Sequence, residues 1–541
     1  MTSRHNPWLV LSALCLGFFM ILLDTTIVNI AIPDMITELG ASLDQILWVV
    51  NAYVLVFAVL LITAGRLGDI FGAKRLFLAG LVVFTLASAA CGLAATPTQL
   101  IAARVVQGVG AALLTPQTLA VITSIFPPEK RGAAFGAWGA VAGLATAAGP
   151  LLGGYLITGW GWEWIFFVNV PVGAVALVFA AIVMPDLRPH RRHRLDGTGT
   201  ALVTAGLFLV TYGLIEGESH HWAEVWGAVT IPMVIGAGAL VLVAFFGYQY
   251  LIRGKEPLVP FAIFADRNFA LMNWVSGAIS FGLLGLFLPL MIYLQSVLGL
   301  NALDAGLATA PVSLIAMVIA PFAGRTSDRI GGKWLLVVGL SLFAAGMGVV
   351  VWQARADSGQ WSLLPGLVVT GVGMGMTFAP LTTVAMRDIA PAIAGAASGL
   401  MNTSRQLGGV IGSAAVGALL QAQLVSHLHA SAAANAAALP EPYREPFVTA
   451  FDRASGAGLH VGAGQSGVDL PAGIPDQVRQ ALIATAERTF HEGFTDALRV
   501  TLILPVAVLA AAALSCFLVR RPHRPHDQGV LHVVRTTTGT P

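Results

Sequence analysis

The feature that most constrains the fold of this chain is a succession of 14 apolar runs separated by mostly short polar segments. A helix needs about 20 mostly apolar residues to cross a bilayer, and a segment in lipid must pair its own backbone polar groups. Only 10% of the 541 residues are charged and 56% are hydrophobic, whereas a soluble domain carries roughly 25% charged residues. The sequence therefore predicts an all-α integral membrane protein with 14 transmembrane helices. These helices are expected to begin near Trp8, Ile46, Leu76, Thr98, Ala133, Glu163, Gly197, Gly227, Phe269, Leu303, Trp334, Ser362, Ile393 and Phe494, and the last to end near Val519.

Basic residues alternate with the predicted helices. Arginines and lysines cluster in every second inter-helix segment, whereas the short loops on the opposite side hold several acids and a single arginine, Arg355. Loops rich in arginine and lysine stay in the cytoplasm. Both termini are therefore expected to be cytoplasmic. The scarcity of lysine and the abundance of alanine and glycine are typical of a GC-rich bacterial genome, so we expect a multi-pass protein of the bacterial inner (plasma) membrane.

A short charged, glycine-rich motif occurs twice. Residues 65–76 read GRLGDIFGAKRL and residues 324–335 read GRTSDRIGGKWL. The first copy joins predicted helices 2 and 3, and the second joins helices 10 and 11. A repeat of this kind indicates two related halves, as in transporters built from repeats. The predicted fold is thus two six-helix bundles, with helices 7 and 8 inserted between them as a hairpin.

The repeat divides the chain into segments. We expect a cytoplasmic N-terminus at 1–7, an N-terminal bundle at 8–184, the inserted pair with cytoplasmic linkers at 185–267, a C-terminal bundle at 268–519 and a disordered cytoplasmic tail at 520–541. Within the C-terminal bundle, residues 424–492 are expected to form an extracytoplasmic loop with one short helix near Pro475–Glu487.

Four stretches together resemble one family. The repeated motif resembles the signature of the major facilitator superfamily, and residues 104–110 (RVVQGVG) match its arginine motif. Residues 23–33 (LDTTIVNIAIP) look like the signature of its 14-helix drug:proton antiporters, and residues 149–154 (GPLLGG) match a motif of its exporters. The resemblance covers about residues 8–520. It implies the major facilitator fold and export of drugs in exchange for protons.

The resemblance also assigns roles. It implies a cytoplasmic gate in the first motif copy, in which Asp69 contacts the start of helix 13 near Pro391 and Ala392. From the residues alone, Asp69 could pair locally or cap a helix N-terminus. The gate residues are Gly65, Arg66, Gly68, Asp69, Gly72, Lys74 and Arg75, of which Gly68 and Gly72 are expected to allow a tight turn. The antiporter motif comprises Gly149, Pro150, Gly153 and Gly154, where glycine permits close helix packing and proline bends the helix.

Asp24 is the candidate proton carrier. A carboxyl deep in a spanning helix is costly and usually functional. Asp24 lies about 24 Å along helix 1, and Arg104 lies about 9 Å from the outer face in helix 4, so the two share a level in the outer half of the membrane. Burial disfavours a charged carboxyl and a nearby arginine favours it, so conformation can control proton binding. The alternative is a static pair that joins helices 1 and 4.

The candidates for substrate contact are polar and aromatic residues expected to face a central cavity. They are Asn29, Trp48, Asn51, Tyr53, Gln117, Asn273, Phe281, Phe287, Tyr293, Gln295, Asn402 and Arg405. Arg405 could instead bind helix-end carbonyls. Two positions depart from the family pattern, Ala73 in the motif and Glu163 between two tryptophans. Glu163 fits a solvated acid or a vestibule that attracts cations.

The sequence predicts a proton-coupled efflux transporter for hydrophobic or cationic drugs, acting as a monomer in the lipid bilayer. No phosphate-binding loop of the GxxxxGK[ST] type, His/Cys cluster or nucleophile–base set is present, so we expect no enzyme activity, cofactor, metal or nucleic-acid partner. The alternatives are an exporter of one endogenous metabolite or lipid, a sensor or scaffold that binds a partner through residues 424–492, and an uptake symporter.

Overall fold

The computed structural model describes residues 6–186, 196–217, 220, 222–252, 257–359, 361–390, 393–456 and 476–520. Within these ranges, 14 helices are long and apolar enough to cross a membrane. All but the last begin within five residues of the predicted starts. The all-α membrane fold predicted from the sequence is therefore confirmed.

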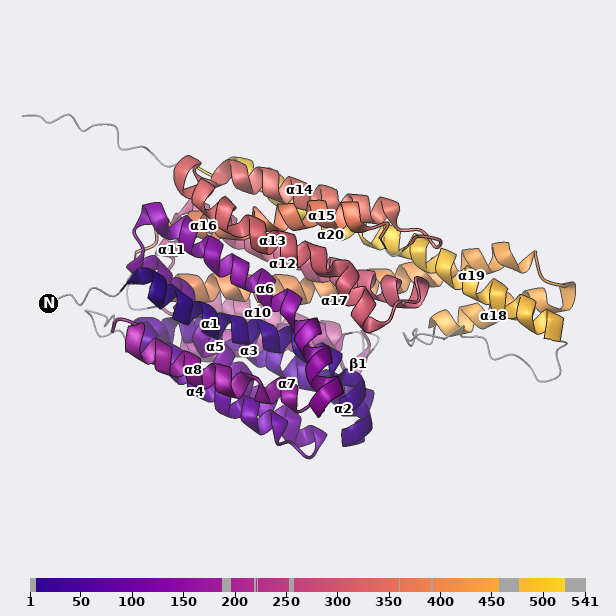
Figure 1. Cartoon of the computed structure of the whole chain (residues 1–541), viewed down its shortest axis with the longest axis horizontal. Helices are drawn as coiled ribbons and strands as arrows, with labels where there is room; N and C mark the ends of the chain where they lie inside the picture. Colours follow the sequence, from indigo (N-terminus) through magenta and orange to yellow (C-terminus); the bar gives the residue numbers. More distant parts are fainter. Residues whose placement is uncertain are drawn as a thin grey trace, which may run out of the picture.

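The helices form two bundles and an intervening pair (Figure 1). The N-terminal bundle contains α1 (Pro7–Ile27), α3 (Leu43–Phe71), α4 (Ala73–Gly92), α5 (Pro97–Ile125), α6 (Pro128–Trp160), α7 (Trp164–Phe167) and α8 (Asn169–Val183), with the short η1 (Val28–Ile30) and α2 (Ile32–Leu39) after α1. The C-terminal bundle contains α12 (Arg267–Ile292), η2 (Tyr293–Val297), α13 (Ala302–Ile330), α14 (Gly332–Gln353), α15 (Leu364–Gly375), α16 (Phe378–Ala385), α17 (Ala394–Ala436), α19 (Asp476–Thr501), α20 (Ile503–Ser515) and η4 (Cys516–Leu518). In the sequence, α9 (Gly197–Glu216), α10 (Ile231–Leu251) and α11 (Ala262–Ala265) lie between the two bundles. An antiparallel pair of strands, β1 (Glu224–Trp226) and β2 (Val229–Thr230), joins α9 to α10.

Helix ends follow local sequence signals. Ser42 caps α3 by accepting a hydrogen bond from the Gln45 amide at 3.2 Å, and the Gln45 side chain accepts from the Ser42 amide in return. This reciprocal pairing satisfies amides that a helix start leaves free. At the other end of α3, Gly72 adopts a φ of 92°, and Gly331 after α13 adopts a φ of 84°. Both motif copies therefore end their helix at a glycine in a conformation that other residues avoid.

Two helix crossings join the halves. Helix α3 packs along α17, and α13 packs along α6. A Cβ at Gly65 would meet the backbone of Gly395 and Gly399, and a Cβ at Gly324 would meet the backbone of Gly132 and Gly136. Because both crossings use the first glycine of a motif copy, the sequence repeat corresponds to a repeated contact. We call the end of the molecule where both motif copies lie the motif end.

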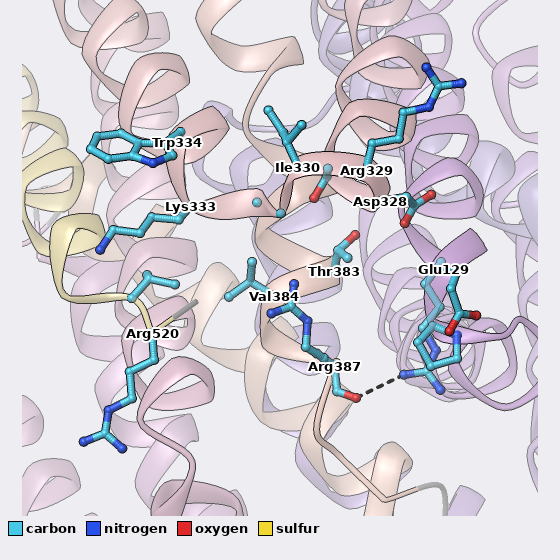
Figure 2. Close-up of a pocket in the computed structure, with 16 residues that line it drawn as sticks. Glu129, Asp328, Arg329, Ile330, Lys333, Trp334, Thr383, Val384, Arg387 and Arg520 are labelled. Carbon is cyan, nitrogen blue, oxygen red and sulfur yellow. Dashed lines mark hydrogen bonds between the residues drawn. The ribbon is translucent and has the colours of Figure 1, made fainter. Parts of the chain in front are cut away.

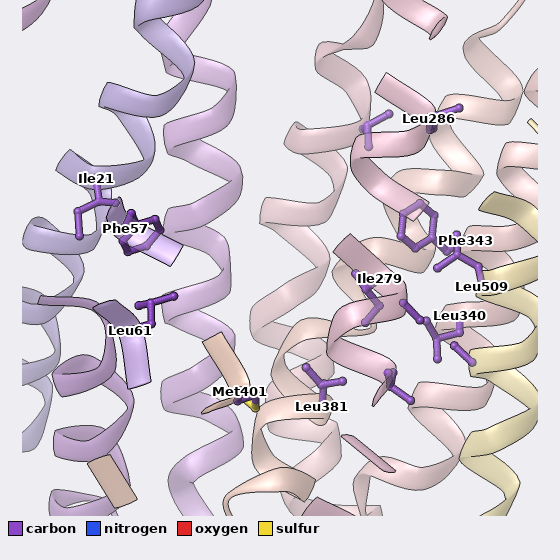
Figure 3. Packing of buried hydrophobic residues seen from close by; sticks show 14 of the residues in the cluster. Ile21, Phe57, Leu61, Ile279, Leu286, Leu340, Phe343, Leu381, Met401 and Leu509 are labelled. Atoms are coloured by element: carbon purple, nitrogen blue, oxygen red, sulfur yellow. The ribbon is translucent and has the colours of Figure 1, made fainter. Parts of the chain in front are cut away.

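Apolar packing fills each half. Buried side chains such as Ile21, Phe57 and Leu61 pack in the N-terminal bundle, and Ile279 and Phe343 are among those in the C-terminal bundle (Figure 3). Large apolar residues are also exposed on the outside, including Leu86 on α4 and Leu240 on α10. An apolar outer surface over apolar cores is what a lipid solvent requires.

The prediction that residues 424–492 are mainly a loop is wrong, whereas the short helix expected near Pro475–Glu487 corresponds to the start of α19. Helix α17 continues to Ala436, α18 spans Glu441–Gly456, and α19 begins at Asp476, with residues 457–475 outside the described part. Alanine has the highest helix propensity. Leu424, Leu428, Ala432 and Ala436 lie on one buried side of α17, and Leu482 and Ala486 of α19 are buried in the same apolar cluster. The helical projection at the right of Figure 1 results from this packing.

Some predictions concern residues outside the described ranges. They include the first five residues of the N-terminal segment, parts of the linkers at 187–195 and 253–256, and the tail from residue 521 onward.

Candidate functional site

The N-terminal bundle contains a buried polar network around Asp24. Arg104 of α5 donates to the Asp24 carboxylate at 2.6 Å, and both side chains are at most 1% exposed. The second Asp24 oxygen accepts from Gln107 at 2.8 Å and from Asn169 at 3.3 Å. The structure therefore brings together the two residues that the sequence placed at one level. It also surrounds this carboxylate of α1 with donors from two other helices, α5 and α8.

The Arg104 guanidinium is held on several sides. Its Nε donates to the Val49 carbonyl at 3.0 Å, and one terminal nitrogen donates to the Gln107 side-chain oxygen at 2.8 Å. The ring of Tyr53 lies 4.2 Å below the guanidinium carbon. Arg104 therefore keeps partners other than Asp24. Protonation of Asp24 would weaken the ion pair, but Arg104 would keep its hydrogen bonds to Val49 and Gln107.

Gln107, Asn169 and Ser88 belong to this network and were not among the predicted site residues. Asn169 donates to the Ser88 hydroxyl at 3.1 Å, and that hydroxyl donates to the Phe166 carbonyl at 2.9 Å. Gln107 follows Arg104 by one helical turn, so the spacing alone could have placed it beside Asp24. Nothing in the sequence near Ser88 or Asn169 indicates contact with helix 1.

Asp69 joins the two halves at the motif end. Its two carboxylate oxygens accept the amides of Gly395 and Ala396, each at 2.9 Å. These amides belong to the first turn of α17, whose unpaired N–H groups and dipole favour an anion. The predicted neighbours Pro391 and Ala392 lie outside the described residues. We call this contact the first latch.

Asp328 forms a second latch in the repeated position. Its oxygens accept the amides of Gly132 and Ala133 in the first turns of α6, at 2.7 and 2.8 Å. Each half thus supplies one aspartate and one helix start to the other half. The sequence showed the repeat of Asp69 at Asp328, but it gave no indication of the second helix start.

The predicted tight turn at Gly68 is wrong. Residues 65–71 form the last turns of α3, and Gly72 alone separates α3 from α4. A Cβ at Gly68 would collide with the side chain of Gln117, whose amide donates to the Ala64 carbonyl at 2.9 Å. Gly68 is therefore needed for close packing with α5. The gate residues before Gly72 are helical because α3 keeps its hydrogen bonds as far as Phe71.

Lysines of both motif copies bind the ends of neighbouring helices. Lys74 donates to the carbonyls of Ala181 and Met184 at 2.8 and 2.7 Å, at the end of α8. Lys333 donates to the Phe517 carbonyl at 2.6 Å, within η4. A cation near free carbonyls at a helix end is favourable. In the N-terminal bundle these contacts join α4 to the end of α8. In the C-terminal bundle they join α14 to η4, which follows α20.

Lys74→Met is expected to lower the stability of the protein by about 1–2 kcal/mol, because it removes charge-assisted hydrogen bonds while keeping the aliphatic stem. The measurement is denaturant or thermal unfolding of the purified protein. The matched control is Lys130→Met, which changes an exposed lysine at the start of α6. Equal stability of the two variants would contradict the proposed contribution of the helix-end contacts.

The antiporter motif lies where α6 faces α1. A Cβ at Gly149 would meet Thr26, and one at Gly153 would meet Ile27, whereas Gly154 has open space. Pro150 lies within α6, and its side chain is outside the described part of the structure. Two of the motif glycines therefore serve close packing of α6 against the helix that carries Asp24.

Several predicted substrate contacts are already engaged within the protein. Tyr293 donates to the Arg355 carbonyl at 2.7 Å, and Asn29 and Asn402 each donate to a carbonyl of the preceding turn. The Trp48 ring lies 6.0 Å from the ring of Tyr212, which belongs to α9 of the inserted pair. The remaining candidates, Asn51, Asn273, Phe281, Phe287, Gln295 and Arg405, are half-buried on α3, α12, η2 and α17. The structure groups Tyr53 with Arg104 and Asp24, whereas the others, including Gln117 on α5 and Asn29 in η1, are distributed over several elements.

Arg405 lies near the middle of the spanning part of α17. Of the two roles that the sequence left open, binding to helix-end carbonyls is not seen, because its side chain makes no hydrogen bond or ion pair with the described residues. A guanidinium in this position is costly unless water or a ligand reaches it.

Comparisons with known proteins agree on a family. The model of the family described as "Major Facilitator Superfamily" matches residues 14–413. An uncharacterized MFS-type transporter of Mycobacterium tuberculosis is 42% identical, over 83% of this chain and 78% of the relative. The "Tetracenomycin C resistance and export protein" of Streptomyces glaucescens is 34% identical, over 78% of this chain and 77% of the relative. The "Multidrug resistance protein Stp" of M. tuberculosis is 32% identical, over 95% of this chain and 92% of the relative.

A solved structure shares the fold. The human organic anion transporter MFSD10 aligns with a TM-score of 0.57 at 14% identity, covering 93% of this chain and 99% of that protein. At this identity the likeness concerns the arrangement of helices alone.

Proposed function

The chain belongs to the major facilitator superfamily, and on that premise we propose that it is a proton-coupled antiporter that exports hydrophobic antibiotics or drugs. As a transporter of this superfamily with 14 candidate spanning helices, it is a multi-pass plasma membrane protein. We further propose that the motif end is cytoplasmic, as the distribution of basic residues predicts. The substrates are small molecules that partition into the apolar core, with cationic compounds included.

One observation supports proton coupling above all others, the buried pair of Asp24 and Arg104. A carboxyl with no exposed surface, deep in a spanning helix, is a costly arrangement that is usually retained for function. Its partners are set so that the charge on Asp24 decides how strongly α1 is held to α5 and α8. Proton uptake or release there would change the contacts among three helices.

The two latches support alternating access. Both aspartates hold the halves together at the motif end, at symmetric positions in the repeat. Opening this end requires α3 to leave α17 and α13 to leave α6. In the proposed cycle, proton binding at Asp24 and substrate binding shift the balance between closed and open latches, as rocking of two halves requires.

The substrate class rests on the relatives. Two of them carry descriptions of antibiotic export or multidrug resistance, and they cover most of this chain. Apolar burial without many directed hydrogen bonds suits compounds that differ in structure. The dedicated exporter of an endogenous metabolite or lipid stays the alternative, since it would share every feature of the fold.

The test uses purified protein in liposomes with an imposed pH gradient and an ethidium-type dye. Dye movement against its own gradient, in exchange for protons and abolished when an ionophore collapses the pH difference, is the expected result. Dye movement in the same direction as protons would indicate a symporter instead. Transport of no tested dye or antibiotic, with a missing external metabolite in a knockout strain, would favour the dedicated exporter.

A further inference from the structure

A cavity of about 690 Å³ lies at the motif end beside the second latch. The turn from α13 into α14 forms one wall, the end of α16 a second, and Val519 with Arg520 a third. The start of α6, including Glu129, closes the remaining side (Figure 2), and Arg131 of the same helix also lines the cavity. Because α6 belongs to the N-terminal bundle and the other walls to the C-terminal bundle, the cavity keeps this shape only while the halves touch here.

Positive charge dominates the lining. Five lining residues are basic and two are acidic. The basic residues are Arg131, Arg329, Lys333, Arg387 and Arg520, and the acidic ones are Glu129 and Asp328. Both oxygens of Asp328 already accept amides of α6. Glu129 is therefore the one lining carboxylate that no amide compensates, and the cavity favours an anion.

Several of these basic groups have no partner of their own. Arg131 is an exception, because it donates to four carbonyls, including those of Met386 and Arg387 at 3.2 and 3.3 Å. The guanidiniums of Arg329, Arg387 and Arg520 make no hydrogen bond or ion pair with any described residue. Arg387 rises into the middle of the pocket in Figure 2, whereas Arg329 and Arg520 extend from its rim. The positive-inside rule accounts for basic residues on this side, but not for their arrangement around one cavity.

The cavity borders an exposed apolar surface. Trp334 and Phe517 are 45% and 48% exposed, and their rings meet edge to face at 5.9 Å. Ile330, on the same turn, is 66% exposed. Tryptophan beside basic residues is typical of the membrane–water interface. A ligand with a phosphate group and acyl chains can use both surfaces, whereas a soluble phosphate can use only the basic one.

We propose that this cavity binds the phosphate headgroup of an anionic phospholipid, with its acyl chains along Trp334 and Phe517. Anionic lipids are attracted to basic sites at the cytoplasmic surface. Because the cavity is complete only when α6 contacts the C-terminal bundle, bound lipid favours the conformation with closed latches. This regulation does not depend on which compound the protein transports.

The test follows the thermal unfolding of the full-length purified protein during titration with phosphatidylglycerol, phosphatidylcholine or glycerol phosphate. Phosphatidylglycerol is expected to stabilise the wild type more than the other two. Arg387→Gln and Arg520→Gln are each expected to need about tenfold more phosphatidylglycerol for half-maximal stabilisation, which is the loss of one charge-assisted contact. Arg387→Lys keeps the charge and is expected to retain most of the response.

The matched control is Arg267→Gln, which removes an exposed arginine at the start of α12 that does not line the cavity. This variant is expected to respond like the wild type. An unchanged response of both Arg387→Gln and Arg520→Gln would overturn the site, and Arg520→Gln decides if Arg387→Gln fails to fold. A full response to glycerol phosphate alone would overturn the lipid assignment in favour of a soluble phosphate.

The effect on conformation is measured between spin labels at positions 75 and 325, which are exposed at the motif end of opposite halves. Phosphatidylglycerol is expected to increase the short-distance population in the wild type and not in Arg387→Gln. An equal distance distribution with and without this lipid would overturn its proposed action on the latches.

Discussion

Asp24→Asn is expected to abolish dye transport driven by a pH gradient, while dye binding persists. Asparagine has nearly the shape of aspartate and can still accept from Arg104, but it cannot take up or release a proton. The carboxylate lies between Arg104, Gln107 and Asn169. The substitution therefore changes the charge at the centre of the network but hardly alters the shape of the side chain. The measurement is dye flux in liposomes with an imposed gradient, together with dye binding at equilibrium.

The exchange leaves Arg104 charged and buried beside a neutral partner. Removing one member of a buried ion pair commonly costs about 3–5 kcal/mol of stability, so unfolding must be measured in parallel. Asp24→Glu is the control that keeps a titratable group. A folded Asp24→Asn protein with undiminished proton-driven flux would move coupling elsewhere. Glu163 and the buried Glu216 of α9 would be tested next.

The double variant Asp69→Asn/Asp328→Asn is expected to open the motif end. Each aspartate accepts two amides at the start of a helix in the other half. An asparagine oxygen can satisfy one amide, but its own NH₂ group then faces the second donor. With charge-assisted hydrogen bonds worth about 1.5–3 kcal/mol, each latch is expected to shift the closed-to-open ratio by about tenfold or more.

The distance between labels at positions 75 and 325 reports this shift. We expect each single variant to enlarge the long-distance population and the double variant to make it dominant. Asp388→Asn changes an exposed acid on the same face and serves as the control. A double variant with the wild-type distribution would show that the glycine-lined crossings hold the halves together without the latches.

The sequence predicted the fold because each of its signals acts locally. A run of apolar residues must become a spanning helix in lipid, whatever surrounds it. The repeated motif gave the two halves, since Gly65 and Gly324 occupy matching crossings. The pairing of Asp24 with Arg104 was predictable because helix rise alone sets the depth of each residue.

Other features depend on tertiary contacts that no local signal encodes. The sequence suggested a turn at Gly68 because glycine is common in turns, whereas its place is set by the Gln117 side chain of another helix. Asn169 reaches Asp24 only because α8 packs against α1. The sequence predicts a loop from residue 424 because no stretch of residues 424–492 could span a membrane and the segment contains several prolines and glycines. Packing against α19 extends α17 instead.

The uninterrupted α17 has a mechanical consequence. Its 43 residues correspond to a rod about 64 Å long, with the first latch at one tip and the packed projection near the other. For a rod of that length, every degree of tilt about the latch displaces the distant tip by about 1 Å. In the proposed cycle, opening and closing at the motif end would therefore be accompanied by a lateral displacement of the projection at the far end of α17. Neighbouring molecules that restrict the movement of this tip would therefore lower the rate of the proposed transport cycle.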